Sequence, residues 1–186
     1  MKPVYNKTHH TYGVDPDKEA LDKKTLIKNK AVGVVENLPF KSNFFDLVVS
    51  EWGLEHLPDT QKAFRKIYRV LKPGGKVIFL TPNIWNYNVW IILAIPNRFH
   101  DFFTRKLYGR QEGDTYPVRY KINSVKKIAE TLEPMGFKKS QIILNGDPSY
   151  ISLNKPLFAI ACLFEKVLDL RPFNFGKVHL IGVYEQ

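Results

Sequence analysis

Residues 36–83 decide the fold, and they read ENLPFKSNFFDLVVSEWGLEHLPDTQKAFRKIYRVLKPGGKVIFLTPN. Phe45 to Ser50 (FDLVVS) and Lys76 to Thr81 (KVIFLT) are apolar runs typical of buried parallel strands. Between them, apolar residues recur at helical spacing: Ala63, Phe64, Ile67, Val70 and Leu71. Asp59 or Thr60 can cap this helix, and Lys72-Pro73-Gly74-Gly75 can end it. The stretch therefore predicts a strand-helix-strand unit of a parallel sheet.

The flanking sequence continues this alternation. Ahead of the unit we expect a strand at Thr11 to Val14, a helix at Asp17 to Lys30 and a strand at Ala31 to Val35. Beyond it we expect a helix capped by Asn123 or Ser124 and ending near Pro134-Met135-Gly136, a strand at Phe137 to Leu144, a helix at Pro156 to Leu168 and a strand at Val178 to Tyr184. The last two strands are predicted to pair antiparallel at the sheet edge.

These elements predict an α/β fold: a Rossmann-like, doubly wound and mostly parallel sheet, covered on both faces, with a C-terminal antiparallel hairpin. A chain of 186 residues with 44% hydrophobic and 25% charged residues matches one globular domain. The apolar runs Val89 to Ile95 and Leu157 to Phe164 are shorter than the ~20 residues of a membrane-spanning helix. The N-terminus resembles no secretory signal, and the single Cys162 suits a reducing compartment, so we expect a soluble, cytoplasmic protein.

The net charge of +10 has two interpretations. It could serve an anionic partner such as nucleic acid, a membrane surface or an acidic substrate, or it could simply keep the surface soluble. Lysines are spread singly or in pairs, and there is no arginine-rich tract or zinc-finger spacing. We favour the solubilising surface and expect no nucleic-acid partner.

In an open α/β sheet, ligands bind beyond the carboxyl ends of the strands. This rule selects four segments of the chain: Gly13 to Pro16, Val34 to Asn37, Ser50 to Gly53 and Thr81 to Asn83. Asp15 could accept hydrogen bonds from both hydroxyls of a ribose. An Asp before Pro also commonly ends a strand in a turn, and the local sequence supports both interpretations equally.

The ordered set LPF, FDLVVS, EHLPD, RVLKPGG and TPN resembles the class I S-adenosylmethionine-dependent methyltransferases, especially the group that includes the quinone-biosynthesis methylases. The resemblance is detailed from Tyr12 to Asn83 and looser at RYKINSVKKIAETLEPMGF. It implies S-adenosylmethionine as cofactor and a small or lipophilic acceptor. By resemblance, Asp15 would hold the ribose, Val35 and Glu36 would lie beside the adenine, and three residues would line the methionine end: Ser50, Glu51 and Trp52.

Methyl transfer is a displacement at a sulfonium, so alignment of the two reactants can supply much of the catalysis. A protein base is needed only for a protonated acceptor, and His56 is the candidate because imidazole titrates near neutrality. The alternative, which we favour, is that His56 packs or caps near Pro58 at the start of the helix.

Two features depart from the family pattern. A glycine-rich cofactor loop should precede the ribose carboxylate by ~20 residues, but only fourteen residues stand before Asp15 and Gly13 is their sole glycine. Val34 stands where the family usually has an acid for the adenine amine, and valine cannot accept a hydrogen bond. We therefore expect one domain, 1–186, truncated at its N-terminus, without its first strand and with weak or no cofactor binding. The rival is a non-catalytic remnant or binding module that acts through a partner or an anionic surface.

Residues 84–120 are rich in aromatic side chains, with Arg98, Arg105 and Arg110 among them. We expect them to form a helical lid or insertion over the acceptor side of the site. The same aromatic residues could stack on single-stranded RNA, or they could be helix core, which we favour for most of them.

Overall fold

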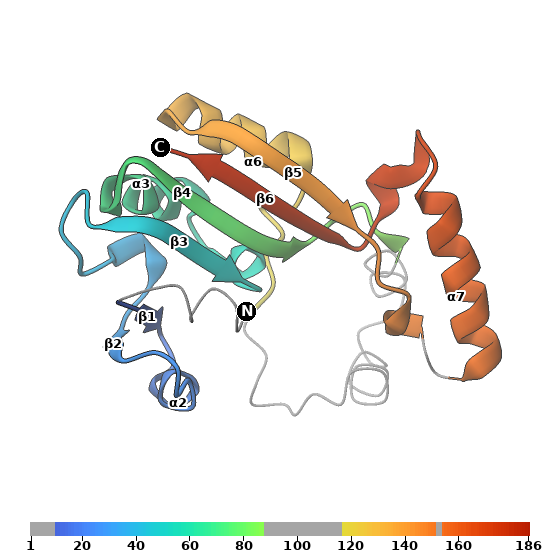
Figure 1. Cartoon of the computed structure of the whole chain (residues 1–186), viewed down its shortest axis with the longest axis horizontal. Coiled ribbons are helices and arrows are strands. Elements are labelled where there is room, and N and C mark those ends of the chain that lie inside the picture. The colour runs from blue at the N-terminus through green and yellow to red at the C-terminus, as the bar shows by residue number, and fades with distance from the viewer. Residues whose placement is uncertain (1–9, 88–116, 152–153) are drawn as a thin grey trace.

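A computed structural model describes residues 10–87, 117–151 and 154–186 (Figure 1). Its main sheet has four strands in the order β3-β4-β6-β5. Their bounds are Phe45–Glu51 (β3), Leu71–Pro82 (β4), His179–Glu185 (β6) and Lys138–Asn145 (β5). β3 and β4 are parallel, whereas β6 is antiparallel to both of its neighbours. The predicted antiparallel pairing of the last two strands is confirmed, with β6 inside the sheet and β5 at its edge.

A separate two-stranded parallel sheet holds β1 (Tyr12–Asp15) and β2 (Asn29–Val32). The start of β1 lies against the start of β3, because the Tyr12 ring packs edge-on against Phe45 at 5.6 Å. No strand among the described residues joins the two sheets by hydrogen bonds.

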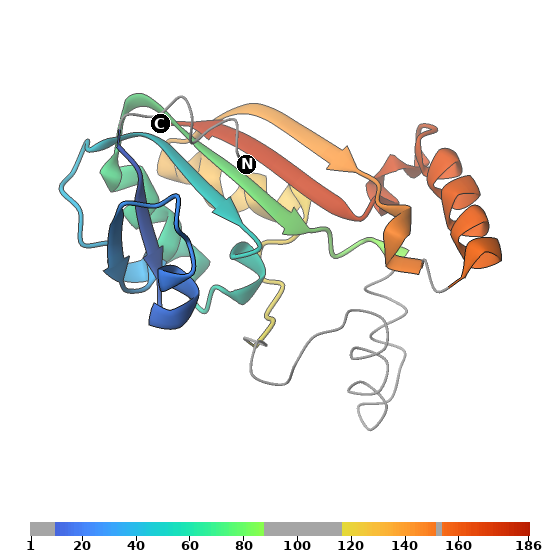
Figure 2. The ribbon, with the colours of Figure 1, turned by 60° about the horizontal axis from the view of Figure 1, so that its bottom comes forward.

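Helices α3 (Thr60–Val70) and α6 (Val125–Leu132) cover one face of the four-stranded sheet (Figure 2). Asp59 caps α3 by accepting a hydrogen bond from the Lys62 amide, and Ser124 caps α6 through the Lys127 amide. Gly136 has a φ of 98° and ends the short helix η4 (Glu133–Met135) that follows α6. The core between helices and sheet includes Phe64, Ile67, Ile128, Leu132, Val77, Phe79 and Tyr184.

The opposite face of this sheet carries no helix among the described residues, so the expected cover on that face stays a prediction. Val49 and Ile143 on this face are each 41% exposed. The reason is topological: the helix between β3 and β4 and the helix before β5 both cross on the same face. Of the other helices, α2 connects the two strands of the small sheet, and α7 lies in the connection between β5 and β6.

The first helix is much shorter than predicted. α2 spans Lys18–Asp22, and β2 begins at Asn29, inside the range that we assigned to the helix. Of the two apolar anchors in this range, Leu21 is buried but Leu26 is 57% exposed. A helix extended beyond Asp22 would have no apolar face to bury, so the chain turns into β2 instead.

The remaining elements are short helices and α7. The short helices are η1 (Val35–Asn37), η2 (Leu54–His56), η5 (Pro148–Ile151) and η6 (Phe173–Gly176). The predicted strand at Ala31 to Val35 therefore ends early, and Val35 belongs to a helical turn. α7 spans Lys155–Leu168, is capped by Asn154, and stands at the end of the sheet, away from α3 and α6 (Figure 1).

Candidate active site at the strand ends

Asp15 ends β1 as predicted, with a half-buried side chain. Its Oδ1 accepts a hydrogen bond from the Asp17 amide at 2.9 Å, which is the turn interaction expected of an Asp before Pro. Its Oδ2 accepts no hydrogen bond from a described residue. The turn and a ligand can therefore use different oxygens of the same carboxylate.

Glu36 lies in η1, just beyond the end of β2, and β2 runs parallel to β1. Its side chain is only 8% exposed, and its buried Oε1 has no hydrogen-bond partner among the described residues. A buried carboxylate oxygen without a donor is costly, which makes Glu36 a good candidate for binding the donor of a ligand. The neighbouring Val35 packs against the core, whereas Val34 is 45% exposed.

Ser50, Glu51 and Trp52 follow one another at the carboxyl end of β3. Trp52 has a φ of 58°, in the left-handed region, and its amide donates to the Leu80 carbonyl at 3.0 Å. A bulky residue with this backbone conformation is uncommon and tends to occur at functional sites. The Trp52 ring is 39% exposed and packs edge-on against His179, with 5.0 Å between ring centroids.

A buried polar network lies beside this strand end. The Thr81 hydroxyl donates to Glu55 Oε2 at 3.0 Å, and Asn123 Nδ2 donates to the Thr81 hydroxyl at 2.6 Å. Each of these three residues is at most 5% exposed. The sequence indicated Thr81 as a strand end and Asn123 only as a possible helix cap, and nothing in it pointed to Glu55 as their partner.

His56 ends η2 and is half-buried, and its Nδ1 lies 3.2 Å from the Pro117 carbonyl. A carbonyl can only accept, so Nδ1 carries the hydrogen of this contact. The cap of α3 is Asp59 and not His56, so the capping role is excluded, while packing near Pro58 and the role as base both stay predictions.

Asn83 closes the fourth predicted segment, but its role is structural. It is 2% exposed, and its Nδ2 donates to the carbonyls of Phe175 and Lys177 at 2.7 and 2.8 Å. These bonds attach the end of β4 to the chain that enters β6.

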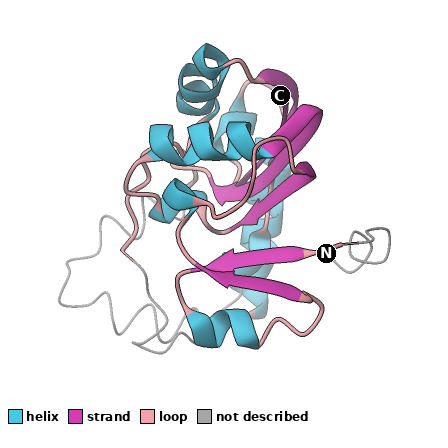
Figure 3. Cartoon of the chain, turned by 90° about the vertical axis from the view of Figure 1, so that its left-hand side faces the viewer, coloured by secondary structure: helices cyan, strands magenta, loops and turns pink. Residues whose placement is uncertain are grey.

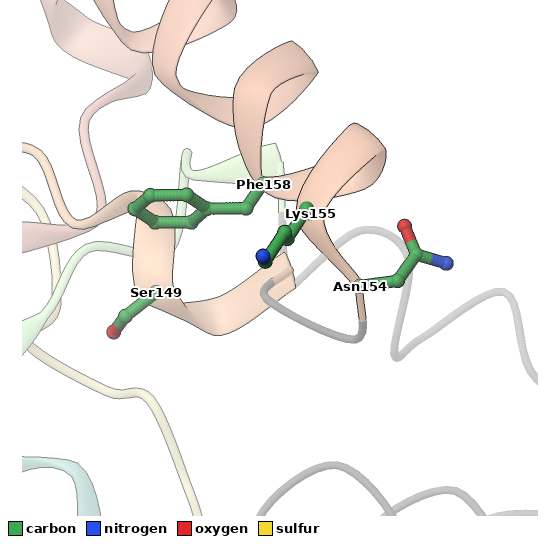
Figure 4. Close-up of a pocket in the computed structure, with 4 residues that line it drawn as sticks. All are labelled: Ser149, Asn154, Lys155 and Phe158. Carbon is green, nitrogen blue, oxygen red and sulfur yellow. The ribbon is translucent and has the colours of Figure 1, made fainter.

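Two further features lie outside this site. A pocket of about 480 Å³ at the start of α7 is lined by Ser149, Asn154, Lys155 and Phe158 (Figure 4), none of which was predicted as a site residue. The predicted lid, 84–120, falls mostly on residues 88–116, outside the described residues.

In the described part of the chain, no helix is long and apolar enough to cross a membrane.

The structure thus forms two groups of predicted residues. Asp15, Val35 and Glu36 lie at the carboxyl end of the small sheet, and Ser50, Glu51 and Trp52 lie at that of β3. Figure 3 shows the small sheet lying alongside the larger one. A common crevice that joins the two groups remains a prediction.

The chain has the nucleotide-binding type of α/β fold. This type is defined by parallel strands with helical crossovers and by carboxylates at the strand ends. Comparisons with known proteins specify it further. The family model described as a methyltransferase domain matches residues 1–79. The solved S-adenosylmethionine-dependent methyltransferase from Methanosarcina mazei superimposes with a TM-score of 0.59 at 16% identity, covering 100% of this chain and 85% of that one. The one from Mesorhizobium loti gives 0.54 at 17% identity, covering 95% and 80%.

Among curated sequences, the ubiquinone/menaquinone biosynthesis C-methyltransferase UbiE of Cupriavidus metallidurans is 32% identical over 113 residues, which are 59% of this chain and 44% of that protein. The UbiE of Pectobacterium carotovorum is 42% identical over 65 residues, covering 34% and 26%. The chain thus spans less than half the length of these curated relatives. Through this match of its first 79 residues and through these relatives, the chain is similar to the class I S-adenosylmethionine-dependent methyltransferases.

The residues present fit part of the S-adenosylmethionine that this family uses. Asp15 and the unpartnered oxygen of Glu36 are acceptors suited to the hydroxyls and the amine of an adenosine. Val34 offers no acceptor, and no glycine turn precedes Asp15 in the described residues. The fit is therefore better for the adenosine half than for the amino-acid half.

Proposed function

We propose that this chain acts in methyl transfer from S-adenosylmethionine to a small or lipophilic acceptor, as one domain in which 84–120 covers the acceptor side. The observation that carries the proposal is the buried, unpartnered Oε1 of Glu36, which lies beyond the end of β2, next to the strand that ends in Asp15. In this arrangement Asp15 accepts from the ribose hydroxyls and Glu36 accepts from the adenine side.

The transfer half of the site is the end of β3. When bound, S-adenosylmethionine supplies a methyl group on a positively charged sulfur. Ser50, Glu51 and Trp52 line that end, and the exposed ring of Trp52 provides an apolar wall for the acceptor. His56 takes a proton at Nε2 where the acceptor carries one, because its Nδ1 already faces the Pro117 carbonyl.

A lipophilic acceptor is favoured by the relatives, whose names place them in ubiquinone and menaquinone biosynthesis. The net charge of +10 is compatible with such an acceptor but does not select it.

The test is a titration of the isotope-labelled 186-residue chain with S-adenosylmethionine and, separately, with adenosine, followed by NMR. We expect both to bind weakly, with dissociation constants above ~100 μM, because each missing hydrogen bond removes about 1 kcal/mol. We expect similar affinities for the two, because the acceptors of Asp15 and Glu36 suit the adenosine half that both ligands share. Shifted amide signals should include Asp15 and Glu36.

Matched variants make this test specific. Asp15→Asn and Glu36→Gln should each weaken adenosine binding, whereas Asp22→Asn, at the end of α2, should leave it unchanged. A micromolar affinity for S-adenosylmethionine with much weaker adenosine binding would contradict the assignment, because it would require a strong site for the amino-acid half.

A non-catalytic binding module is the second candidate, and the exposed apolar face of α7 favours it. Failure of both ligands to bind at millimolar concentration would select this alternative.

A further inference from the structure

Helix α7 presents an apolar face to the outside of the molecule. Its inner face is formed by Ala161, Glu165 and Leu168, which are all less than 9% exposed. On its outer side, Ile160 and Leu163 are 62% and 65% exposed. With their exposed neighbours they form what we name the α7 surface: Ile160, Leu163, Phe164, Val167, Leu170, Phe173 and Phe175. Figures 1 and 2 both show α7 standing apart from α3 and α6.

The helical spacing makes this surface continuous. Positions 160, 163, 164 and 167 follow the i, i+3, i+4, i+7 pattern of one helix face. A helix in contact with water normally places polar residues at these positions. On α7, apolar residues occupy the outer side as well as the inner side. This pattern indicates that the outer side also packs against a binding partner.

The charges around the α7 surface are basic. Lys155, Lys166 and Arg171 are exposed, and none of them forms an ion pair with a described residue. Lys155 lies next to the ring of Phe158 at the start of the helix (Figure 4).

Both acidic residues within residues 155–175 interact with other described residues. Glu165 is buried and accepts hydrogen bonds from the Tyr87 hydroxyl and the Asp147 amide at 3.1 and 3.3 Å. Asp169 forms an ion pair with Lys177 at 2.5 Å. The free charge around the α7 surface is therefore positive.

We infer that the α7 surface docks on an anionic lipid membrane, with α7 lying in the plane of the headgroups. Apolar side chains would enter the boundary of the acyl chains, while the lysines and Arg171 would contact anionic headgroups. A second copy of the chain fits less well. A symmetric contact through this face would bring two basic borders together with no unpaired acid on α7 to neutralise them.

The inference is independent of the proposed methyl transfer. It concerns α7 and η6, which contribute none of the predicted cofactor residues. Vesicle binding and adenosine binding are separate measurements, so each proposal can fail alone.

The experiment is flotation of the full chain with vesicles of phosphatidylcholine containing one-third phosphatidylglycerol, and with vesicles of phosphatidylcholine alone. We expect binding to the anionic vesicles and at least about tenfold weaker binding to the neutral ones, since each basic residue near the surface contributes roughly fivefold. The double variant Ile160→Gln/Leu163→Gln should lose at least about tenfold in binding, because two exposed apolar side chains no longer enter the lipid.

Matched controls separate the α7 surface from general basicity. Leu26→Gln replaces an apolar residue that is 57% exposed elsewhere and should leave vesicle binding unchanged. Lys166→Gln should weaken binding about fivefold, and Lys138→Gln, on the edge strand β5, should have much less effect. Circular dichroism of each variant checks that the fold is retained.

Several outcomes would overturn the inference. One is no binding to anionic vesicles, and another is binding that the double variant leaves intact, since attraction to the net charge alone would then explain it. A third is sedimentation showing a dimer that the double variant dissociates while vesicles do not bind. In that case the α7 surface would be an interface between copies.

Discussion

The rings of Trp52 and His179 meet edge to face at 75° and 5.0 Å, where β3 ends and β6 begins. Trp52 is held there by a left-handed backbone. His179 is only 7% exposed, and burial lowers its pKa below the ordinary value of 6.5, while the carboxylate of Asp147 opposes this shift. At the end of β3, the buried imidazole of His179 therefore packs against the partly exposed indole of Trp52.

Removing the indole should raise the pKa of His179. In Trp52→Ala the imidazole gains water, so its pKa should move up toward 6.5. The measurement is an NMR titration of the His179 ring protons. Trp85→Ala, which removes another exposed indole, is the control and should leave this pKa where it is. An unchanged value in Trp52→Ala would show that the indole does not shield His179.

His179 should make the free energy of unfolding of the chain depend on pH. Because the pKa of His179 is lower in the folded chain than in the unfolded one, the unfolded state takes up the proton first as the pH falls. The stabilisation is therefore fully present above pH 6.5 and declines as the pH falls through the folded-state pKa. Urea unfolding at pH 7.5, 6 and 5 should show the wild-type chain losing stability relative to His179→Gln. A constant difference between the two would refute this.

Thr81→Val should be strongly destabilising. The hydroxyl of Thr81 donates to Glu55 and accepts from Asn123 in a buried network, and valine removes both of these hydrogen bonds. Asn123 keeps only its bond to the Pro82 carbonyl. We expect a loss of about 1–3 kcal/mol in the free energy of unfolding. Thr131→Val, which removes an exposed hydroxyl from α6, should change it by about 0.5 kcal/mol or less. Equal losses in the two variants would argue against the network.

Gly182→Ala should disrupt the packing of β6. An added Cβ would lie 2.2 Å from Cζ of Phe79, which is itself fully buried. Overpacking of this kind costs about 1–3 kcal/mol. Making room with Phe79→Leu should recover part of that loss in the double variant, so the two substitutions should be non-additive. Additive losses in a double-mutant cycle would mean that the two side chains do not compete for space.

Val34→Asp should strengthen adenosine binding. It restores an acceptor at the position where the family usually has an acid, and one such hydrogen bond contributes about 1 kcal/mol, or roughly fivefold in affinity. Val32→Asp, two residues earlier at the end of β2, adds the same charge and should have little effect. A similar gain from both substitutions would reflect charge alone.

Much of the fold follows from local sequence patterns. The apolar run at Phe45 to Ser50, the cap at Asp59 and the turn at Gly136 all correspond to observed features, because each depends on residues close together in the chain. The motif order from LPF to TPN also carries the resemblance to the methyltransferases, and a methyltransferase domain model matches residues 1–79.

The tertiary structure decided what depends on distant residues. The sequence favoured a long first helix, which lacked a partner for Leu26. It did not show that α3 and α6 would share one face of the sheet while α7 stands at its end (Figure 1). Trp52 meets His179, and Thr81 meets Glu55 and Asn123, only because β3, β4 and β6 are neighbours in the sheet. Periodicity and capping are encoded within a few residues, whereas contacts between strand ends and the exposure of a helix face depend on how whole elements pack.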